Sequence, residues 1–164
     1  MNERERDGGK TPPPAAQDKS MDARKDLELL IVEDRQVMLK ILRRLLFQLG
    51  YVRVDEAVNG LAALERIAGK RYDLILSDWN MDAMSGIELL KAVRAKPETQ
   101  STPFVLVTAE AKRENILTAR AAGASGYLVK PFKLDVLERT IESVLAANAG
   151  FVSPAITGAA PALD

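Results

Sequence analysis

The stretch Leu29-Leu30-Ile31-Val32-Glu33-Asp34 (residues 29–34) joins an unbroken apolar run to two carboxylates. Continuous apolar runs of this length are typical of parallel strands that are covered on both faces. Three further apolar runs also end at a polar residue: Leu74–Ser77 before Asp78, Phe104–Val107 before Thr108, and Gly126–Val129 before Lys130. The pattern predicts several buried parallel strands with chemistry-bearing residues at their ends.

The segments around these strands complete an alternating α/β pattern. Residues 52–57 alternate between apolar and polar side chains, as an edge strand does. Apolar residues recur at helical spacing within residues 38–49, 61–68, 87–94, 116–122 and 134–145. Five alternating strand–helix units predict a doubly wound, five-stranded parallel sheet flanked by five helices.

Composition excludes several kinds of function. The chain has 23 basic and 23 acidic residues, so no bulk charge favours nucleic acid or a membrane surface. It has neither cysteine nor histidine, which excludes thiolate catalysis, cysteine-bound zinc and a Ser-His-Asp triad. The N-terminus lacks the apolar core of a secretory signal, and we expect a cytoplasmic protein.

Domain organisation follows from local composition. Residues 1–25 are charged and proline-rich, and we expect a disordered N-terminal extension. Residues 26–147 form the predicted domain, and residues 148–164 are expected to be a flexible C-terminal tail. Since 17 residues are too few for a DNA-binding domain, we expect output through protein contacts of a monomer.

The polar strand ends predict a magnesium-dependent phosphate site. In an open parallel sheet the carboxyl ends of the strands form the ligand-binding crevice. Asp34 and Asp78 are expected to bind Mg²⁺ directly and Glu33 through a water, because gathered carboxylates need a cation. Asp78 is also the candidate nucleophile, with Lys130 offsetting charge and Thr108 donating a hydrogen bond to phosphate.

Each of these residues also has an ordinary structural interpretation. An acidic pair after a strand can begin a helix, and the aspartate, threonine and lysine can be turn or loop residues. Taken singly, these interpretations are the better ones, because short motifs often match by chance. Four strand ends with complementary chemistry favour the site.

The motifs around these residues extend the match. The matching stretches are Val32–Asp34, Ser77–Met81 with Met84 and Gly86, Val107–Ala111, and Gly123–Phe132. Over about residues 27–147 the chain resembles the receiver domain of two-component response regulators, and more narrowly the CheY-like chemotaxis branch. This resemblance implies the flavodoxin-like receiver fold with strand order 2-1-3-4-5.

The resemblance also implies roles for individual residues. Asp78 is similar to the phosphoacceptor that takes phosphate from a partner histidine kinase or a small donor. The backbone carbonyl of Asn80 is implied as a further Mg²⁺ ligand, and Thr108 with Tyr127 as the conformational switch. The bond between Lys130 and Pro131 is expected to be cis.

Two residues are implied to tune dephosphorylation, and two positions depart from the family. Asn80 and Glu110 flank the route of the hydrolytic water, which suggests a signal lasting seconds to minutes. Glu33 stands where the family usually has Asp. Asp82 replaces the usual proline, and its carboxylate can be a solvated charge, an outer magnesium ligand, or a brake on phosphorylation. Residues 35–37 leave the phosphodonor and any auxiliary phosphatase open.

Three functions remain to be weighed. The first is a phosphorylation-activated switch, not an enzyme in the ordinary sense, whose phosphorylated form binds a target such as the flagellar motor switch. The second is a phosphate sink or phosphorelay intermediate with the same chemistry. The third is a small Mg²⁺-dependent phosphohydrolase, which would need a second Asp where Asn80 stands. A flavodoxin-type cofactor protein is disfavoured, because no phosphate-binding loop follows the first strand.

Overall fold

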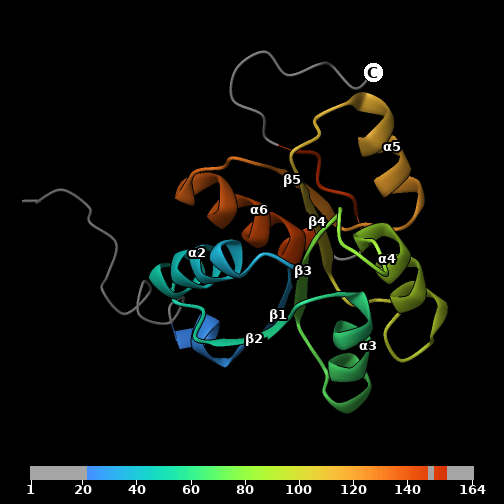
Figure 1. The fold of residues 1–164 in the computed structure, drawn as a ribbon. Coiled ribbons are helices and arrows are strands. Elements are labelled where there is room, and N and C mark those ends of the chain that lie inside the picture. The colour runs from blue at the N-terminus through green and yellow to red at the C-terminus, as the bar shows by residue number, and fades with distance from the viewer. Residues whose placement is uncertain (1–21, 148–149, 155–164) are drawn as a thin grey trace, which may run out of the picture.

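The computed structural model describes residues 22–147 and 150–154. Five parallel strands form one sheet in the order β2-β1-β3-β4-β5, which confirms the predicted topology (Figure 1). The strands are β1 (Glu28–Val32), β2 (Arg53–Ala57), β3 (Leu74–Asp78), β4 (Phe104–Thr108) and β5 (Gly126–Val129). Their bounds differ from the predicted ones by at most one residue at either end, and Asp78 and Thr108 are themselves the last residues of their strands.

Helices cover both faces of the sheet (Figure 1). They are α2 (Gln36–Gln48), α3 (Gly60–Gly69), α4 (Gly86–Ala95), α5 (Arg113–Ala121) and α6 (Leu134–Ala147). The buried residues of α2 and α6 share one core cluster, and those of α3, α4 and α5 share another. This division of the helices between two faces is the doubly wound arrangement expected from the alternating strand–helix pattern.

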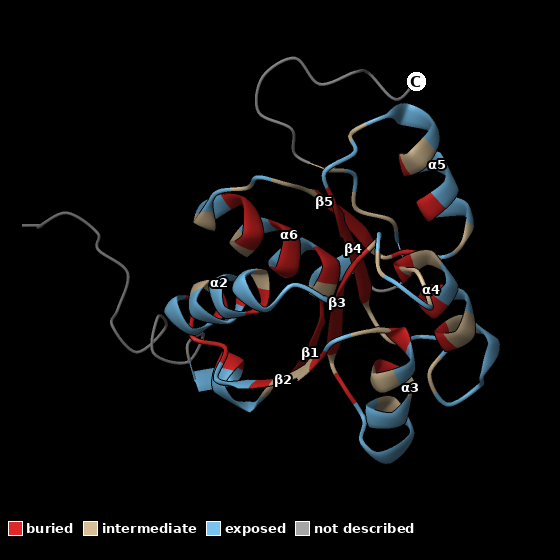
Figure 2. Cartoon of the chain, viewed as in Figure 1, coloured by how far each residue is buried: buried red, intermediate tan, exposed pale blue. Residues whose placement is uncertain are grey.

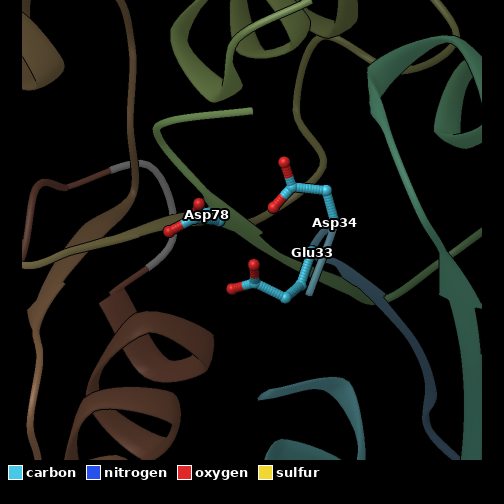
Figure 3. Close-up of side chains that lie close together, drawn as sticks. All are labelled: Glu33, Asp34 and Asp78. Atoms are coloured by element: carbon cyan, nitrogen blue, oxygen red, sulfur yellow. The ribbon is translucent and has the colours of Figure 1, made fainter. Parts of the chain in front are cut away.

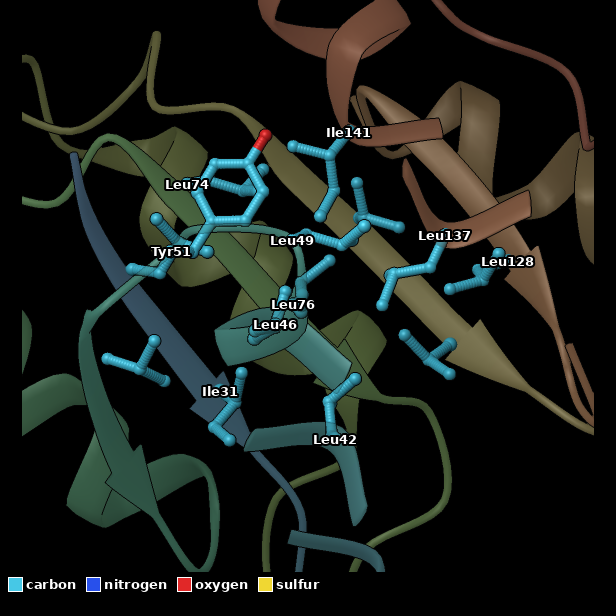
Figure 4. Packing of buried hydrophobic residues seen from close by; sticks show 14 of the residues in the cluster. Ile31, Leu42, Leu46, Leu49, Tyr51, Leu74, Leu76, Leu128, Leu137 and Ile141 are labelled. Carbon is cyan, nitrogen blue, oxygen red and sulfur yellow. The ribbon is translucent and has the colours of Figure 1, made fainter. Parts of the chain in front are cut away.

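The strands feed both core clusters because successive side chains of a strand point to opposite faces. In β1, Leu29 and Ile31 belong to the cluster under α2 and α6, while Leu30 and Val32 belong to the other. Figure 2 shows the buried residues concentrated in the sheet and on the inner sides of the helices, and Figure 4 shows the packing of the first cluster. Burial on both faces explains why these strands are apolar without alternation.

The described residues near the two ends of the chain are more ordered than composition predicted. Residues 22–26 are helical, and the side chain of Arg24 is buried although it falls within the predicted disordered extension. Near the other end, Val152 forms a parallel bridge with Gly126. Residues 1–21, 148–149 and 155–164 lie outside the described residues, and so does most of the predicted extension and tail. Within the described residues, no helix has the length and apolarity that crossing a membrane requires.

Candidate functional site

The polar residues predicted at the strand ends meet at the carboxyl end of the sheet. Asp78 ends β3, Glu33 and Asp34 directly follow β1, and Lys130 directly follows β5. The backbone N–H of Glu33 donates to the carbonyl of Ala57 at 3.0 Å, which extends the ladder between β1 and β2 to the edge of the site. Figure 3 shows the three carboxyl groups gathered over the end of β3.

The three carboxylates are close enough to share one cation. One oxygen from each of Glu33, Asp34 and Asp78 lies within 4.8 Å of the others. Glu33 and Asp78 are buried, with 2 % and 8 % of their surface exposed, while Asp34 is exposed. Mg²⁺ prefers oxygen ligands, keeps several waters and binds through few carboxylates, so this donor set with one side open to solvent fits it.

Lys130 links two of the carboxylates. Its Nζ donates to Oδ1 of Asp78 at 2.8 Å and to Oε1 of Glu33 at 3.2 Å. Burial alone would lower the pKa of Lys130, but the hydrogen bond and charge of Asp78, reinforced by Glu33, raise it. The ammonium group is therefore held charged beside the nucleophile candidate.

Burial and a neighbouring negative charge both disfavour the charged form of Glu33. Burial and the neighbouring charge of Asp78 raise the pKa of Glu33, against the opposing effect of Lys130. Its Oε2 also accepts the backbone N–H of Arg35 at 3.1 Å, which fixes the side chain at the start of α2. One lysine thus does not fully compensate the carboxylates, and an added cation would stabilise them.

The family follows from the sequence together with this site. A model of the response regulator receiver domain matches residues 29–142. The chain belongs to the response regulator receiver family. Receiver domains are signalling switches that take phosphate from histidine kinases and bind Mg²⁺ at an acidic site. The interpretation of the strand-end motifs as a CheY-like receiver is confirmed.

Curated relatives place the receiver near chemotaxis proteins. It is 43 % identical over 118 residues to the chemotaxis protein CheY of Pseudomonas aeruginosa, covering 72 % of this chain and 95 % of the relative. It is 42 % identical over 120 residues to CheY-3 of Vibrio cholerae, covering 73 % and 92 % of the two chains.

Solved structures agree with the family. The receiver superposes on chemotaxis protein CheY4 of Vibrio cholerae with a TM-score of 0.68 at 36 % identity, covering 72 % of this chain and 98 % of the other. The receiver domain of a sensor histidine kinase from Pseudomonas aeruginosa gives a TM-score of 0.67 at 31 % identity, covering 73 % and 97 %. That relative holds a magnesium ion coordinated in its active-site cleft.

The loop after β3 holds Asp82, one of the two departures from the family pattern. Asn80 and Asp82 are both exposed in this loop, and their proposed roles stay predictions. Ala83 has a positive φ of 70°, and the N–H of Met84 donates to the carbonyl of Asp82 at 2.8 Å across it. This tight γ-turn is strained for a residue with a side chain.

Gly86 lets α4 start directly against the end of β3. A Cβ at this position would lie 2.2 Å from the carbonyl oxygen of Asp78, a distance that real atoms do not reach. A capping box between Ser85 and Glu88 fixes the first turn of α4 at the same place. Gly86 was quoted within the motif, but its packing role comes from a contact that sequence spacing did not reveal.

The predicted switch residues lie together beside the site. The hydroxyl of Tyr127 donates to the backbone carbonyl of Glu110 at 2.6 Å, and the backbone N–H of Glu110 donates to Oγ1 of Thr108 at 3.1 Å. Burial, together with the charge of Glu110, raises the pKa of Tyr127 to about 12. The Tyr127 side chain is fully buried, and its hydroxyl is bound to the backbone.

Trp79, which directly follows β3, contacts the predicted switch residue Tyr127. Its ring meets that of Tyr127 edge-on, with the centroids 6.2 Å apart and the planes at 72°. The peptide bond between Lys130 and Pro131 is cis, as the resemblance implied. Two contacts were missed from the sequence, the pairing of Glu33 with Lys130 and the bond from Tyr127 to Glu110, because each joins strand ends far apart in the chain.

Proposed function

We propose that this receiver is a phosphorylation-activated switch of a chemotaxis-type two-component system. Asp78 accepts the phosphoryl group from a partner histidine kinase in a Mg²⁺-dependent reaction. The observation that carries the proposal is the placement of Lys130 and the two other carboxylates around Asp78. The similarity to chemotaxis proteins named CheY supports the chemotaxis role.

The proposed transfer uses groups that are already positioned. An oxygen of the Asp78 carboxylate forms the bond to phosphorus while the bond to the donor's histidine nitrogen breaks, and the imidazole leaves with a proton. Lys130, held 2.8 Å from Oδ1 of Asp78, offsets negative charge on the phosphoryl oxygens. Asp34, Asp78 and the carbonyl of Asn80 would hold Mg²⁺ directly and Glu33 would hold it through a water, and the ion would supply positive charge at the phosphoryl group.

Thr108 and Tyr127 then carry the signal to the surface. Thr108 is buried at the end of β4, next to the acceptor strand, where its hydroxyl can donate to a phosphoryl oxygen. That movement would break its hydrogen bond with the N–H of Glu110 and disturb the loop that holds the Tyr127 hydroxyl. The phosphorylated form then binds a protein target, for which we propose the flagellar motor switch.

The test is Trp79 fluorescence during titration with Mg²⁺ and then acetyl phosphate. Trp79 is the chain's single tryptophan and directly follows the acceptor, so its signal reports the site. We expect a Mg²⁺-dependent change followed by a donor-dependent change in the wild type. The second change, and labelling detected by mass spectrometry, should be lost in Asp78→Asn and kept in the control Asp26→Asn, whose exposed carboxylate lies before β1 at the other end of the sheet. Labelling that survives Asp78→Asn would contradict the proposal.

The motor output is tested separately from the chemistry. Phosphorylated receiver and Asp78→Asn protein are compared for binding to a purified flagellar motor switch protein. We expect binding to strengthen on phosphorylation only when Asp78 is present. Labelling without a gain in affinity would favour the phosphate sink or phosphorelay role, in which the receiver drains a kinase.

A further inference from the structure

The two edges of the sheet are protected in different ways. An edge strand presents unpaired backbone groups to other chains, and charged side chains commonly guard it. At one edge, β2 carries the charged side chains of Arg53, Asp55 and Glu56. At the other edge, β5 reads Gly-Tyr-Leu-Val and has no charge of its own. The β5 edge therefore needs another form of cover.

The residues that follow α6 supply a cover on this edge. The N–H of Val152 donates to the carbonyl of Ser125 at 2.9 Å, and Val152 bridges Gly126 in the parallel sense. In Figure 1 this segment runs between β5 and α5. A strand, a helix and a returning parallel segment form the usual crossover unit, and residues 150–154 return to the β5 edge in this way through one bridge.

The side chains of the segment follow strand geometry as well. Phe151 packs against the cluster under α3, α4 and α5, which contains Tyr127. Val152 packs against the opposite cluster under α2 and α6. Consecutive residues on opposite faces are the signature of a strand in register with the sheet. The guanidinium of Arg120 on α5 lies 5.8 Å from the centre of the Phe151 ring and adds a cation–π contact.

From these contacts we propose that residues 150–154 are a docked edge strand that occupies the β5 surface beside the Tyr127 switch. The segment closes the β5 edge to other strands and packs Phe151 against the cluster that holds Tyr127. A target protein that binds at the β5 surface must therefore bind over the segment or displace it. This last consequence rests on the proposed function, whereas the docking itself does not.

The test compares full-length variants by amide hydrogen exchange without any phosphodonor. Phe151→Asp/Val152→Asp places two charges into the apolar contacts, and Ser153→Asp places a charge at the adjacent exposed residue as the matched control. We expect the amides of residue 152 and of β5 to exchange about tenfold faster in the double variant and at the wild-type rate in Ser153→Asp. Unchanged exchange in the double variant, or equal acceleration in the control, would overturn the proposal.

A third variant covers the case in which the double variant does not fold. Val152→Pro removes the N–H that donates to Ser125, restricts the backbone at this position, and keeps an apolar side chain. It should also accelerate exchange at β5, and wild-type exchange there would overturn the docking. Because no phosphate is present in these measurements, a failure of Asp78 to accept phosphate would end the proposed function without affecting this result.

Discussion

A positively charged side chain lies at the amino end of the strands and another at their carboxyl end, but their partners differ in charge. At the amino end, Arg94 donates to the backbone carbonyls of Thr102 at 2.6 Å and Gly123 at 2.9 Å, and to Oγ of Ser125 at 3.2 Å. At the carboxyl end, Lys130 contacts two carboxylates with a third beside them. The first cation has neutral partners, and the second is outnumbered by negative charge.

The difference separates a structural contact from a reactive site. Burial lowers the pKa of Arg94, and its directed hydrogen bonds to backbone carbonyls tie α4 to the loops before β4 and β5. At the other end, burial and Asp78 raise the pKa of Glu33, so the site favours an incoming cation. Polar groups with directed hydrogen bonds to the fold stabilise the structure, while clustered charged groups with a shifted pKa are candidates for function.

Arg24 is a second buried cation at the amino end of the sheet, and it has several hydrogen-bonding and charged partners. Its guanidinium donates to the carbonyl of Leu49 at 2.7 Å, pairs with Glu138 at 3.0 Å and with Glu142, and lies 5.3 Å from the centre of the Tyr51 ring. Leu49 and Tyr51 lie in the loop between α2 and β2, and Glu138 and Glu142 lie on α6. The residues before β1 are thereby fixed to the domain by a cation that has several partners.

The largest expected effect is on the chemistry at the carboxyl end. Lys130→Met keeps the apolar stem but removes the charge that contacts Asp78 and Glu33. We expect the rate of phosphorylation by acetyl phosphate to fall about 100-fold or more, the scale of losing one group that stabilises transition-state charge. Lys133→Met, at an exposed position nearby, is the control and should keep its rate. A normal rate in Lys130→Met would remove the distinction between the two ends.

The next effect is on stability at the amino end. Arg94→Met loses three hydrogen bonds, two of them to the half-buried acceptors of Thr102 and Ser125, and we expect the free energy of unfolding to fall by about 2–3 kcal/mol. Urea denaturation measures this, with Lys91→Met on the exposed side of α4 as the control. The phosphorylation rate of the folded variant should stay within about twofold of wild type. A large loss of rate would mean that the two ends are coupled.

A smaller effect on stability should show that the backbone is strained at Ala83, in the loop after β3. Among the described residues other than glycine, Ala83 alone has a positive φ. Ala83→Gly relieves that strain, and we expect a gain of about 0.5–1 kcal/mol in the free energy of unfolding. Ala95→Gly, at the end of α4, should instead lose up to about 1 kcal/mol. Thermal denaturation of both variants checks the opposite signs, and a loss in both would show that the turn is unstrained.

The smallest effect is a pH dependence from Glu33. Because its pKa is raised in the folded state, its stabilising contribution is present below the pKa of the unfolded chain and is lost as pH rises through the folded pKa. Glu33→Gln does not titrate, so its stability relative to wild type should improve between about pH 4 and pH 7. We expect a change below about 1 kcal/mol, measured by urea denaturation in Mg²⁺-free buffer. A difference in the free energy of unfolding that stays constant across this pH range would contradict the raised pKa of Glu33.

Much of the fold was predictable from local patterns. The apolar runs of β1, β3 and β4 mark strands buried on both faces, and their first polar residues mark the edge of the sheet. The charged, alternating pattern of β2 marks an exposed edge. The pattern misjudged Arg24 and Phe151, because their burial depends on partners more than 25 residues away or on another element, which composition does not report.

The sequence by itself determined which residues could do the chemistry. Glu33, Asp34, Asp78 and Lys130 each follow or end a strand, and strand ends in a parallel sheet must meet at one edge. Only the tertiary structure decided how they share charge. Lys130 reaches Glu33 as well as Asp78, and the Tyr127 hydroxyl is bound to Glu110. The physical reason is that strand position depends on local pattern, whereas hydrogen-bond partners and desolvation depend on distances set by the packed sheet and helices.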